Sequence, residues 1–170
     1  MKVKDERHKH SPTKIALVTG GFDPLHSGHI QYLKAAATYA DYLIVGLNSD
    51  EWLTRKKGRP FMPIEERVAI LNELLVVDEV ITFDDSDDTG CGAIEKVKHL
   101  YKDPFNNKFH KKIIFCNGGD RTAENIPEQE KFKGDEWVDF EFGVGGENKK
   151  NSSSWILEDY KNAKTIRNWG

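Results

Sequence analysis

The sequence predicts an α/β fold in three layers, with helices on both faces of a five-stranded, mainly parallel sheet. Two patterns carry this prediction. Short and nearly continuous apolar runs recur along the chain, which is typical of strands that are buried on both faces. Segments with helical spacing of apolar residues alternate with these runs, and this alternation favours parallel strands that are joined by right-handed helical crossovers.

The apolar runs predict the strands in chain order. They are "KIALVTG" (14–20), "YLIVGLNSD" (42–50), "DEVITF" (78–83), "KKIIFCNGG" (111–119) and "EWVDFEF" (136–142). The first run ends in a glycine, the second in polar residues and the fourth in a pair of glycines. Because glycine and small polar residues favour turns, we expect a loop where each of these strands ends.

Helical patterns lie between and after the strands. In residues 29–41 apolar side chains recur at helical spacing, and alanine, the best helix former, is frequent. Residues 63–75 have a proline and two glutamates in the first turn, where each suits a helix. Residues 93–101 are amphipathic, and residues 154–169 form the last expected helix. Two shorter helical segments are expected, one turn at the start of a basic loop over 51–61 and a short helix after Pro127.

Size and composition describe one soluble domain. The chain has 170 residues, of which 38% are hydrophobic and 31% charged, and this length is typical of a single domain. We expect a disordered arm over residues 1–13 and one domain over residues 14–170. The formal net charge of −3 gives no support to a nucleic-acid partner. We expect no membrane span, since no apolar run approaches ~20 residues, and we expect no signal peptide. The two cysteines suit a cytoplasmic location.

Polar or glycine-rich segments follow four of the five expected strands. These segments cover residues 20–29, 48–59, 117–121 and 145–154. In parallel sheets ligands bind beyond the carboxyl ends of the strands, so the four segments are expected to form one site. An acidic turn over residues 84–90 follows the third strand and is the exception.

The first of these segments, "GGFDPLHSGHI" (20–30), has the features of an anion site. Gly20 and Gly21 allow a tight turn and a close approach of backbone to ligand. A helix that begins near His26 and His29 would point its free N–H groups and its positive end at the ligand. The two imidazoles would add hydrogen bonds or charge, which suits a phosphate chain whose charge grows in a transition state.

Two other interpretations of the same segment stay open at this point. His26 and His29 could bind zinc together with Asp23, as in a metal hydrolase. The segment could also be an ordinary helix start that carries two incidental histidines.

The segment "GGFDPLHSGH" (20–29) resembles the GxFDxxHxGH signature of the HxGH nucleotidyltransferase superfamily. That superfamily includes glycerol-3-phosphate and choline-phosphate cytidylyltransferases, heptose-1-phosphate adenylyltransferases and phosphopantetheine adenylyltransferases. Further resemblance lies in residues 47–71, which carry "KGRP" and "PIEER", in "NGGDR" (117–121), and in "NSSSWI" (151–156). The resemblance covers residues 14 to 160 approximately and implies a Rossmann-like fold.

The resemblance implies a nucleotidyltransferase, in which a phosphate oxygen of the acceptor attacks the α-phosphorus of a nucleoside triphosphate. "KGRP", "PIEER" and "GGD" resemble the heptose branch, so we expect ATP and a sugar phosphate such as a heptose 1-phosphate. Cytidylyltransferases carry an R-T-E-G run where this chain has "ENKKN" (147–151). The alternative is CTP with glycerol-3-phosphate or a related alcohol phosphate. An alternative of another class is a nucleotide-binding module without catalysis, because Gly21 replaces the usual Thr, Ser or Cys.

The resemblance also assigns roles to residues of this chain. Catalytic roles are expected of His26, His29 and Lys57. Nucleotide contacts are expected from Gly20, Gly21, Phe22, Asp23, Asn117, Gly118, Gly119, Asp120, Ser152, Ser153 and Ser154. Contacts with substrate phosphates are expected from Lys56, Arg59, Arg67 and Lys149, where Arg67 would alternatively support the basic loop. Mg²⁺ would screen the triphosphate, with no protein ligand assigned. The expected partners are a nucleoside triphosphate, a small phosphorylated sugar or polyol, and a second copy of the chain in a homodimer.

Overall fold

A computed structural model of the chain describes residues 12–103, 105, 111–119, 121–122, 126–146 and 152–166. Of the arm expected over residues 1–13, residues 1–11 lie outside this described part. The chain enters the sheet at Thr13, whose backbone N–H and hydroxyl both donate to the Asp41 carboxylate, each at 3.1 Å.

The described part of the chain contains one sheet of five strands, all parallel, in the order β3-β2-β1-β4-β5. The strands are β1 (Lys14–Gly20), β2 (Tyr42–Leu47), β3 (Glu79–Thr82), β4 (Lys112–Cys116) and β5 (Val138–Glu141). The helices are α1 (Ser27–Ala36), α2 (Asp50–Lys57), α3 (Ile64–Glu73), α4 (Cys91–Leu100), α5 (Pro127–Lys131) and α6 (Ser153–Ile166). The predicted five-stranded α/β sheet is therefore confirmed.

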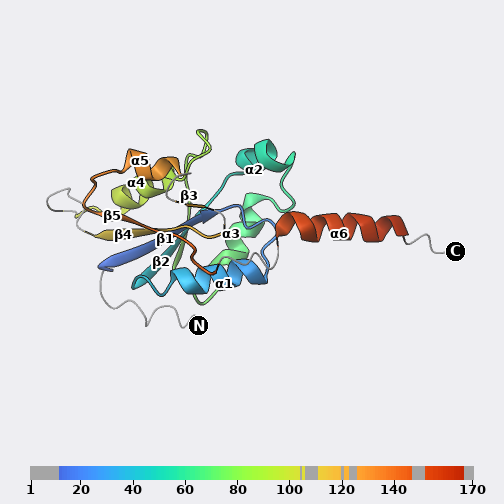
Figure 1. Cartoon of the computed structure of the whole chain (residues 1–170), viewed down its shortest axis with the longest axis horizontal. Helices are drawn as coiled ribbons and strands as arrows, with labels where there is room; N and C mark the ends of the chain where they lie inside the picture. The colour runs from blue at the N-terminus through green and yellow to red at the C-terminus, as the bar shows by residue number, and fades with distance from the viewer. Residues whose placement is uncertain are drawn as a thin grey trace.

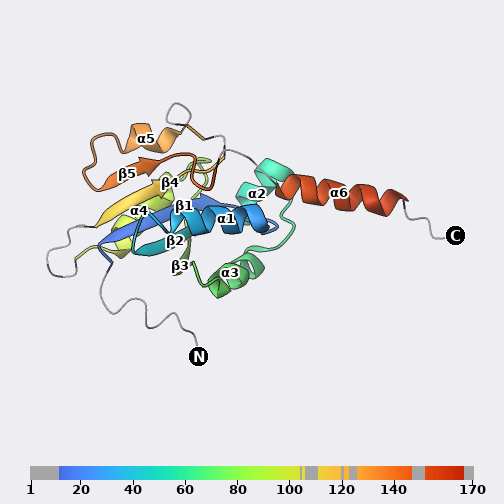
Figure 2. The same cartoon turned by 60° about the horizontal axis from the view of Figure 1, so that its bottom comes forward.

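The core lies in two layers, one on each face of the sheet (Figures 1 and 2). Alternate residues of each strand point to opposite faces, so neighbours in β1 such as Ala16 and Leu17 enter different layers. Helices α1 and α3 cover one layer, and α4 covers the other with α5 beside it. Strands that are buried on both faces are almost wholly apolar, which is why the sequence shows them as continuous runs.

The strand order reverses beside β1. From β1 the chain winds outward through β2 and β3, and it then returns to place β4 and β5 on the other side of β1. Loops that leave the carboxyl ends of β1 and β4 diverge at such a point and leave a crevice, which is where ligands bind in sheets of this kind.

Helix α2 is longer than the single turn that the sequence predicts for the basic loop 51–61. It spans eight residues and is capped by Ser49, whose hydroxyl accepts from the Trp52 N–H at 3.0 Å. Acidic residues occupy its first turn and three basic residues its last, as the helix dipole favours. Gly58 ends it with a φ of 87°, a conformation that glycine adopts without strain. The start and stop signals of a full helix are thus present in the sequence.

Helix α6 begins beside the sheet and extends away from the rest of the molecule (Figures 1 and 2). Its large aromatic residues Trp155 and Tyr160 are exposed. Among the residues that the structure describes, no helix combines the length and the apolar character needed to cross a bilayer.

Candidate functional site

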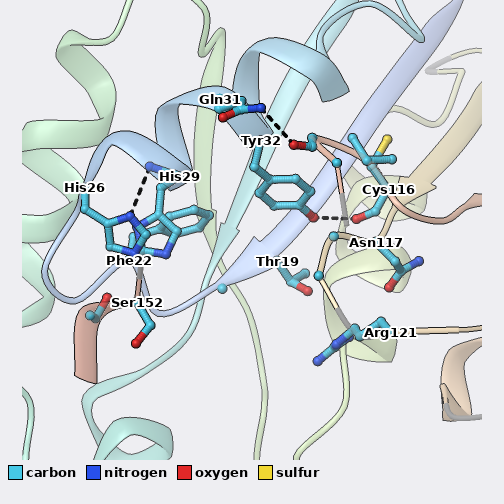
Figure 3. Close-up of a pocket in the computed structure, with 18 of the residues that line it drawn as sticks. Thr19, Phe22, His26, His29, Gln31, Tyr32, Cys116, Asn117, Arg121 and Ser152 are labelled. Carbon is cyan, nitrogen blue, oxygen red and sulfur yellow. Dashed lines mark hydrogen bonds between the residues drawn. The ribbon is translucent and has the colours of Figure 1, made fainter. Parts of the chain in front are cut away.

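A pocket of about 390 Å³ opens beyond the carboxyl ends of β1 and β4 (Figure 3). The loop after β1 and the first turn of α1 form one side, the loops after β4 and β5 form another, and the start of α6 and the end of α2 complete it. The sequence-predicted residues that line it are Gly20, Phe22, His26, His29, Lys57, Asn117, Gly118, Gly119, Ser152, Ser153 and Ser154.

The two histidines stand together at the N-terminus of α1. Their rings are stacked, with centroids 3.7 Å apart and an interplanar angle of 24°. His26 is the N-cap, and its Nδ1 accepts from the Gly28 N–H at 3.1 Å. A neutral imidazole that accepts at Nδ1 carries its proton on Nε2, so Nε2 is the donor of His26 in this form. The ring of Phe22 meets His29 edge-on at 4.9 Å and closes the inner side of the pair.

His29 is uncharged at neutral pH. The pKa of its imidazole is lowered to about 3, mainly by burial and in smaller part by the nearby charges of His26 and Lys57. Its Nδ1 is buried and has no hydrogen-bond partner among the described residues. An unpaired buried nitrogen is costly, so a ligand or water that pairs with this atom would bind favourably. The neutral imidazole offers hydrogen bonding rather than full charge.

Lys57 brings a cation to the same side of the pocket. It is the last residue of α2, and its Nζ donates to the Asp23 carbonyl at 3.1 Å. Partial burial lowers the pKa of its ammonium, the Asp23 carboxylate acts in the opposite direction, and Arg67 lowers the pKa further. The contact with the Asp23 carbonyl holds the ammonium close to the histidines.

The opposite wall depends on close backbone packing around Tyr32, a residue of α1. The Tyr32 hydroxyl donates to the Cys116 carbonyl at 2.6 Å. A Cβ at Gly118 would lie 2.9 Å from the ring, and a Cβ at Gly145 would lie 2.9 Å from the Tyr32 Cα. Gly145 also has a φ of 87°, and its carbonyl accepts from the Gln31 side chain at 3.0 Å (Figure 3). Only glycine lets both loops approach α1 this closely.

The N-terminus of α6 supplies a second helix start to the pocket. The Ser152 hydroxyl caps it by accepting from the Trp155 N–H at 3.1 Å. The Ser153 hydroxyl donates to the Pro24 carbonyl at 2.9 Å and so joins α6 to the loop after β1. The positive ends of α1 and α6 therefore face one cavity, which is a favourable arrangement for a polyanion.

Arg67 lies outside the pocket, where its guanidinium is part of the scaffold. The residue is 1% exposed. Its Nη1 donates to the carbonyls of Gly21 and Asn48, both at 2.9 Å. Its Nε donates to the Met62 carbonyl at 3.1 Å, and its Nη2 contacts the Asp50 carboxylate at 2.5 Å. This geometry corresponds to the loop-supporting alternative, and Arg67 does not line the pocket.

Asp23 and Gly21 also serve the scaffold. The Asp23 carboxylate is 1% exposed and accepts from the backbone N–H groups of Phe61 at 2.7 Å and Met62 at 2.8 Å. It is therefore not directed at the histidines as a zinc ligand, and no cluster of three metal-binding side chains occurs in the described part of the chain. A Cβ at Gly21 would lie 2.8 Å from Leu53 of α2, so the packing of α2 explains why a glycine stands there.

The remaining predicted residues lie elsewhere. Lys56 points to the acidic turn, with its Nζ 3.4 Å from Asp88. Arg59 is exposed beyond the end of α2 and does not line the pocket. Asp120 and Lys149 fall outside the described residues.

Several lining residues were not singled out from the sequence. They are Thr19, Gly28, Gln31, Tyr32, Cys116, Arg121, Val144, Gly145 and Gly146. Tyr32 lies three residues after His29, so helical periodicity places it on the same side of α1. Arg121 directly follows the "NGGD" run, and this position could have indicated a second cation at the pocket.

Two helix N-termini, an imidazole pair and glycine loops surround one crevice of this α/β fold, an arrangement that suits a phosphorylated ligand. Residues 17–156 match the family model described as cytidylyltransferase-like. This match covers well over half of the chain, and the protein belongs to the cytidylyltransferase-like family. The family membership that the sequence motifs predict is thereby confirmed.

Curated relatives include two bifunctional proteins named HldE. The one from Sulfurimonas denitrificans is 44% identical over 95 residues, which are 55% of this chain and 20% of that protein. The one from Geobacter metallireducens is 37% identical over 123 residues, which are 71% of this chain and 22% of that protein. The chain thus spans about a fifth of the length of the curated relatives that it matches.

Solved structures agree on the fold. A lipopolysaccharide core biosynthesis protein from Thermoplasma volcanium is 26% identical with a TM-score of 0.53, covering 78% of this chain and 94% of that chain. A bifunctional NMN adenylyltransferase/ADP ribose pyrophosphatase from Francisella tularensis, complexed with AMP and a manganese ion, has a TM-score of 0.55 at 17% identity, covering 88% of this chain and 42% of that chain. The Rossmann-like fold is confirmed.

Replacing Arg67 by methionine should destabilise the protein strongly. The substitution keeps an unbranched side chain but leaves three carbonyls without a donor and Asp50 without its cation. Losing one partner of such a buried network costs about 3–5 kcal/mol in the free energy of unfolding. Urea titration of Arg67→Met against the wild type measures this loss. Arg59→Met is the matched control, and equal stability of the two variants would contradict the scaffold role.

The lowered pKa of His29 predicts a loss of stability in acid. In the unfolded chain the His29 imidazole takes up a proton near pH 6.5, whereas in the folded chain it does so only near pH 3. Between these values the unfolded state binds more protons, so stability falls as the pH falls. One such group contributes up to ~1.4 kcal/mol per pH unit in that window. The free energy of unfolding, measured from pH 7 to pH 4.5, should fall less steeply for His29→Gln than for the wild type.

A substitution of another histidine separates this effect from general acid sensitivity. His99 is exposed on α4, and His99→Gln should keep the slope of the wild type. Identical slopes for all three proteins would show that His29 is not held neutral by its surroundings.

Proposed function

We propose that the protein transfers the nucleoside monophosphate of ATP to a sugar phosphate such as a heptose 1-phosphate, with release of pyrophosphate. The observation that carries this proposal is the convergence of two helix N-termini, the stacked histidines and Lys57 on one pocket at the strand-order reversal. Such a pocket can hold a triphosphate and stabilise charge that develops on its oxygens.

Support for ATP and a sugar phosphate comes from sequence. The segment that contains "KGRP" and "PIEER" resembles the heptose branch of the superfamily. Both curated relatives described above carry the name HldE. A structural relative of 26% identity is described as a lipopolysaccharide core biosynthesis protein.

The proposed chemistry is a direct displacement. An oxygen of the acceptor phosphate forms a bond to the α-phosphorus of ATP, the bond from that phosphorus to the bridging oxygen breaks, and pyrophosphate leaves with the electron pair. The acceptor oxygen is already anionic, so no protein base is required. The chain's own groups position the two anions and stabilise the charge that moves onto the leaving group.

Each side of the pocket has a role in this displacement. The Nε2–H of His26 and the neutral imidazole of His29 would donate to oxygens around the α-phosphorus. The first turn of α6, with Ser152 at its cap, would receive the β- and γ-phosphates, because the first N–H groups of a helix have no acceptor within the helix itself. Lys57 would neutralise phosphate oxygens at the junction between nucleotide and acceptor. Asn117 and the adjacent glycines would contact the ribose and base.

Mg²⁺ belongs to the proposed substrate rather than to a resident metal site. The described lining provides hydroxyl, carbonyl and imidazole groups but no carboxylate, and carboxylates are the protein ligands that Mg²⁺ favours. A triphosphate that brings its own Mg²⁺ supplies most of the ligand oxygens itself. The ion would lower the negative charge that the attacking anion meets.

The decisive experiment is an assay of pyrophosphate release with ATP, CTP, GTP and UTP, each against a panel of sugar and polyol phosphates. Turnover is expected with ATP and a sugar 1-phosphate. His29→Ala should lower kcat by about a hundredfold, on the order of the loss of one preorganised donor in the transition state. His99→Ala, at an exposed position of α4, is the matched control and should keep wild-type turnover.

Other outcomes select other functions. Turnover with CTP and glycerol-3-phosphate would replace the ATP proposal by the cytidylyltransferase alternative. Nucleotide binding in a calorimetric titration, without turnover on any acceptor, would support a binding module that has lost its chemistry.

Removing divalent cations should abolish turnover without unfolding the protein. Excess EDTA would strip Mg²⁺ from ATP, while the melting temperature should stay unchanged because the described residues contain no metal-binding cluster. Added Mg²⁺ should restore the rate. A large fall in melting temperature with EDTA would instead reveal a structural metal.

A further inference from the structure

The acidic turn after β3, which the sequence separates from the site, is in contact with α2. The Nε and Nη2 of Arg55 both lie 3.1 Å from the Asp88 carboxylate, and Nη2 also donates to the Asp85 carbonyl at 2.7 Å. Lys56 contacts the same Asp88 carboxylate through its other oxygen, at 3.4 Å. The turn thus contacts the C-terminal half of α2 through ion pairs with two basic side chains of the helix.

The same turn also holds the start of α2. Asp85 is 4% exposed, and one of its carboxylate oxygens accepts from the Asn48 side chain at 3.0 Å and the Ser49 N–H at 2.8 Å. The other oxygen accepts from the Ser49 hydroxyl at 2.7 Å, and that hydroxyl in turn caps α2. Both ends of the helix are therefore tied to one turn.

On its other side α2 meets the scaffold around Arg67. Asp50 of its first turn pairs with the Arg67 guanidinium, and Leu53 packs against Gly21 in the loop after β1. The helix lies between these contacts and the acidic turn, so its rotation about its own axis is defined from two directions. That rotation determines where the side chains of its last turn point.

The consequence appears at the two neighbouring lysines. Lys56 is directed to Asp88, whereas Lys57 lines the pocket and contacts the Asp23 carbonyl. Adjacent helical residues are separated by about 100° around the axis, so a modest rotation of α2 would turn Lys57 out of the pocket.

We propose that Asp88 and Arg55 are positioning residues, which hold α2 in the rotation that directs Lys57 at the substrate phosphates. This inference rests on the proposed function. The side chains of Arg55 and Asp88 are 40% and 43% exposed, respectively. Ion pairs of that exposure contribute little to global stability. Their effect is therefore expected in catalysis, where a small displacement of a charged group away from the reacting atoms is costly.

The test is a double-mutant cycle of Arg55→Gln and Asp88→Asn. Asp88 has a φ of 61°, a conformation that asparagine also tolerates. Each single variant should lower kcat/KM by about tenfold, within the range that a misplaced group costs. The double variant should lose clearly less than the product of the two single losses, because the two side chains act chiefly through each other. Asp87→Asn is the matched control: this carboxylate lies in the same turn and binds the Thr89 N–H and hydroxyl.

Amide hydrogen exchange provides a readout that does not depend on turnover. In Asp88→Asn the amides of the last turn of α2 should exchange faster, while those of α3 should not change. Unchanged exchange in α2, unchanged kcat/KM, or additive losses in the double variant would each overturn the proposal.

A wild-type protein without transferase activity would contradict the proposed function but would still allow the positioning role to be decided. In that case the dissociation constant of ATP replaces kcat/KM. Weaker binding to Asp88→Asn than to Asp87→Asn, by several-fold, would support the role, and equal binding would overturn it.

Discussion

The buried guanidinium of Arg67 is the interaction on which one side of the site depends. It lies where the turn after β1, the end of β2 and the segment before α3 meet, and it satisfies one backbone carbonyl from each. These carbonyls lie in irregular segments, where the regular ladder of the sheet supplies no partner. One planar cation with several N–H donors pairs with all three, and Asp50 supplies the charge that makes its burial tolerable.

The opposite side of the pocket depends on close steric packing. Tyr32 is packed against Gly118 and Gly145, and each contact is closer than any other residue would allow. The two sides are therefore sensitive to different changes. The side near Lys57 responds to altered charge, because ion pairs and charged hydrogen bonds hold it. The side near Tyr32 responds to added volume, because backbone and ring are in direct contact.

Much of the fold follows from patterns that are local in the sequence. Each strand is an apolar run with a glycine or polar end, and the histidine segment has the sequence of a helix start, so the sheet and the pocket side at α1 were predictable. For Arg67 the sequence offered loop support only as an alternative, and for Asp23 it did not indicate a scaffold role. Their partners lie in segments that are distant along the chain, and a basic residue in a phosphate site has the same appearance in sequence as one that bridges carbonyls.

The contacts of the acidic turn were also not predictable from the sequence. Four aspartates in five positions indicate a solvated loop, and nothing local reveals that Asp85 is buried or that Asp88 faces Arg55. Only the crossover geometry brings the end of β3 beside the helix that follows β2. Contacts between loops that follow neighbouring strands are therefore difficult to predict from the sequence of such a site.

The neutral state of His29 is consistent with a reaction between two anions. Two charged imidazoles with centroids 3.7 Å apart, beside Lys57, would repel one another, and burial resolves the conflict by removing one charge. In the proposed function, attraction for the triphosphate would then come from the helix N-termini and from the cations Lys57 and Arg121. The partial charges of the helix N-termini would favour a triphosphate and would hold a departing pyrophosphate less strongly than further full cations. In the proposed reaction, the negative charge of a bound triphosphate would raise the proton affinity of both imidazoles. The hydrogen bonds that they donate can therefore strengthen as charge moves onto the leaving group, which is the moment at which stabilisation accelerates the reaction.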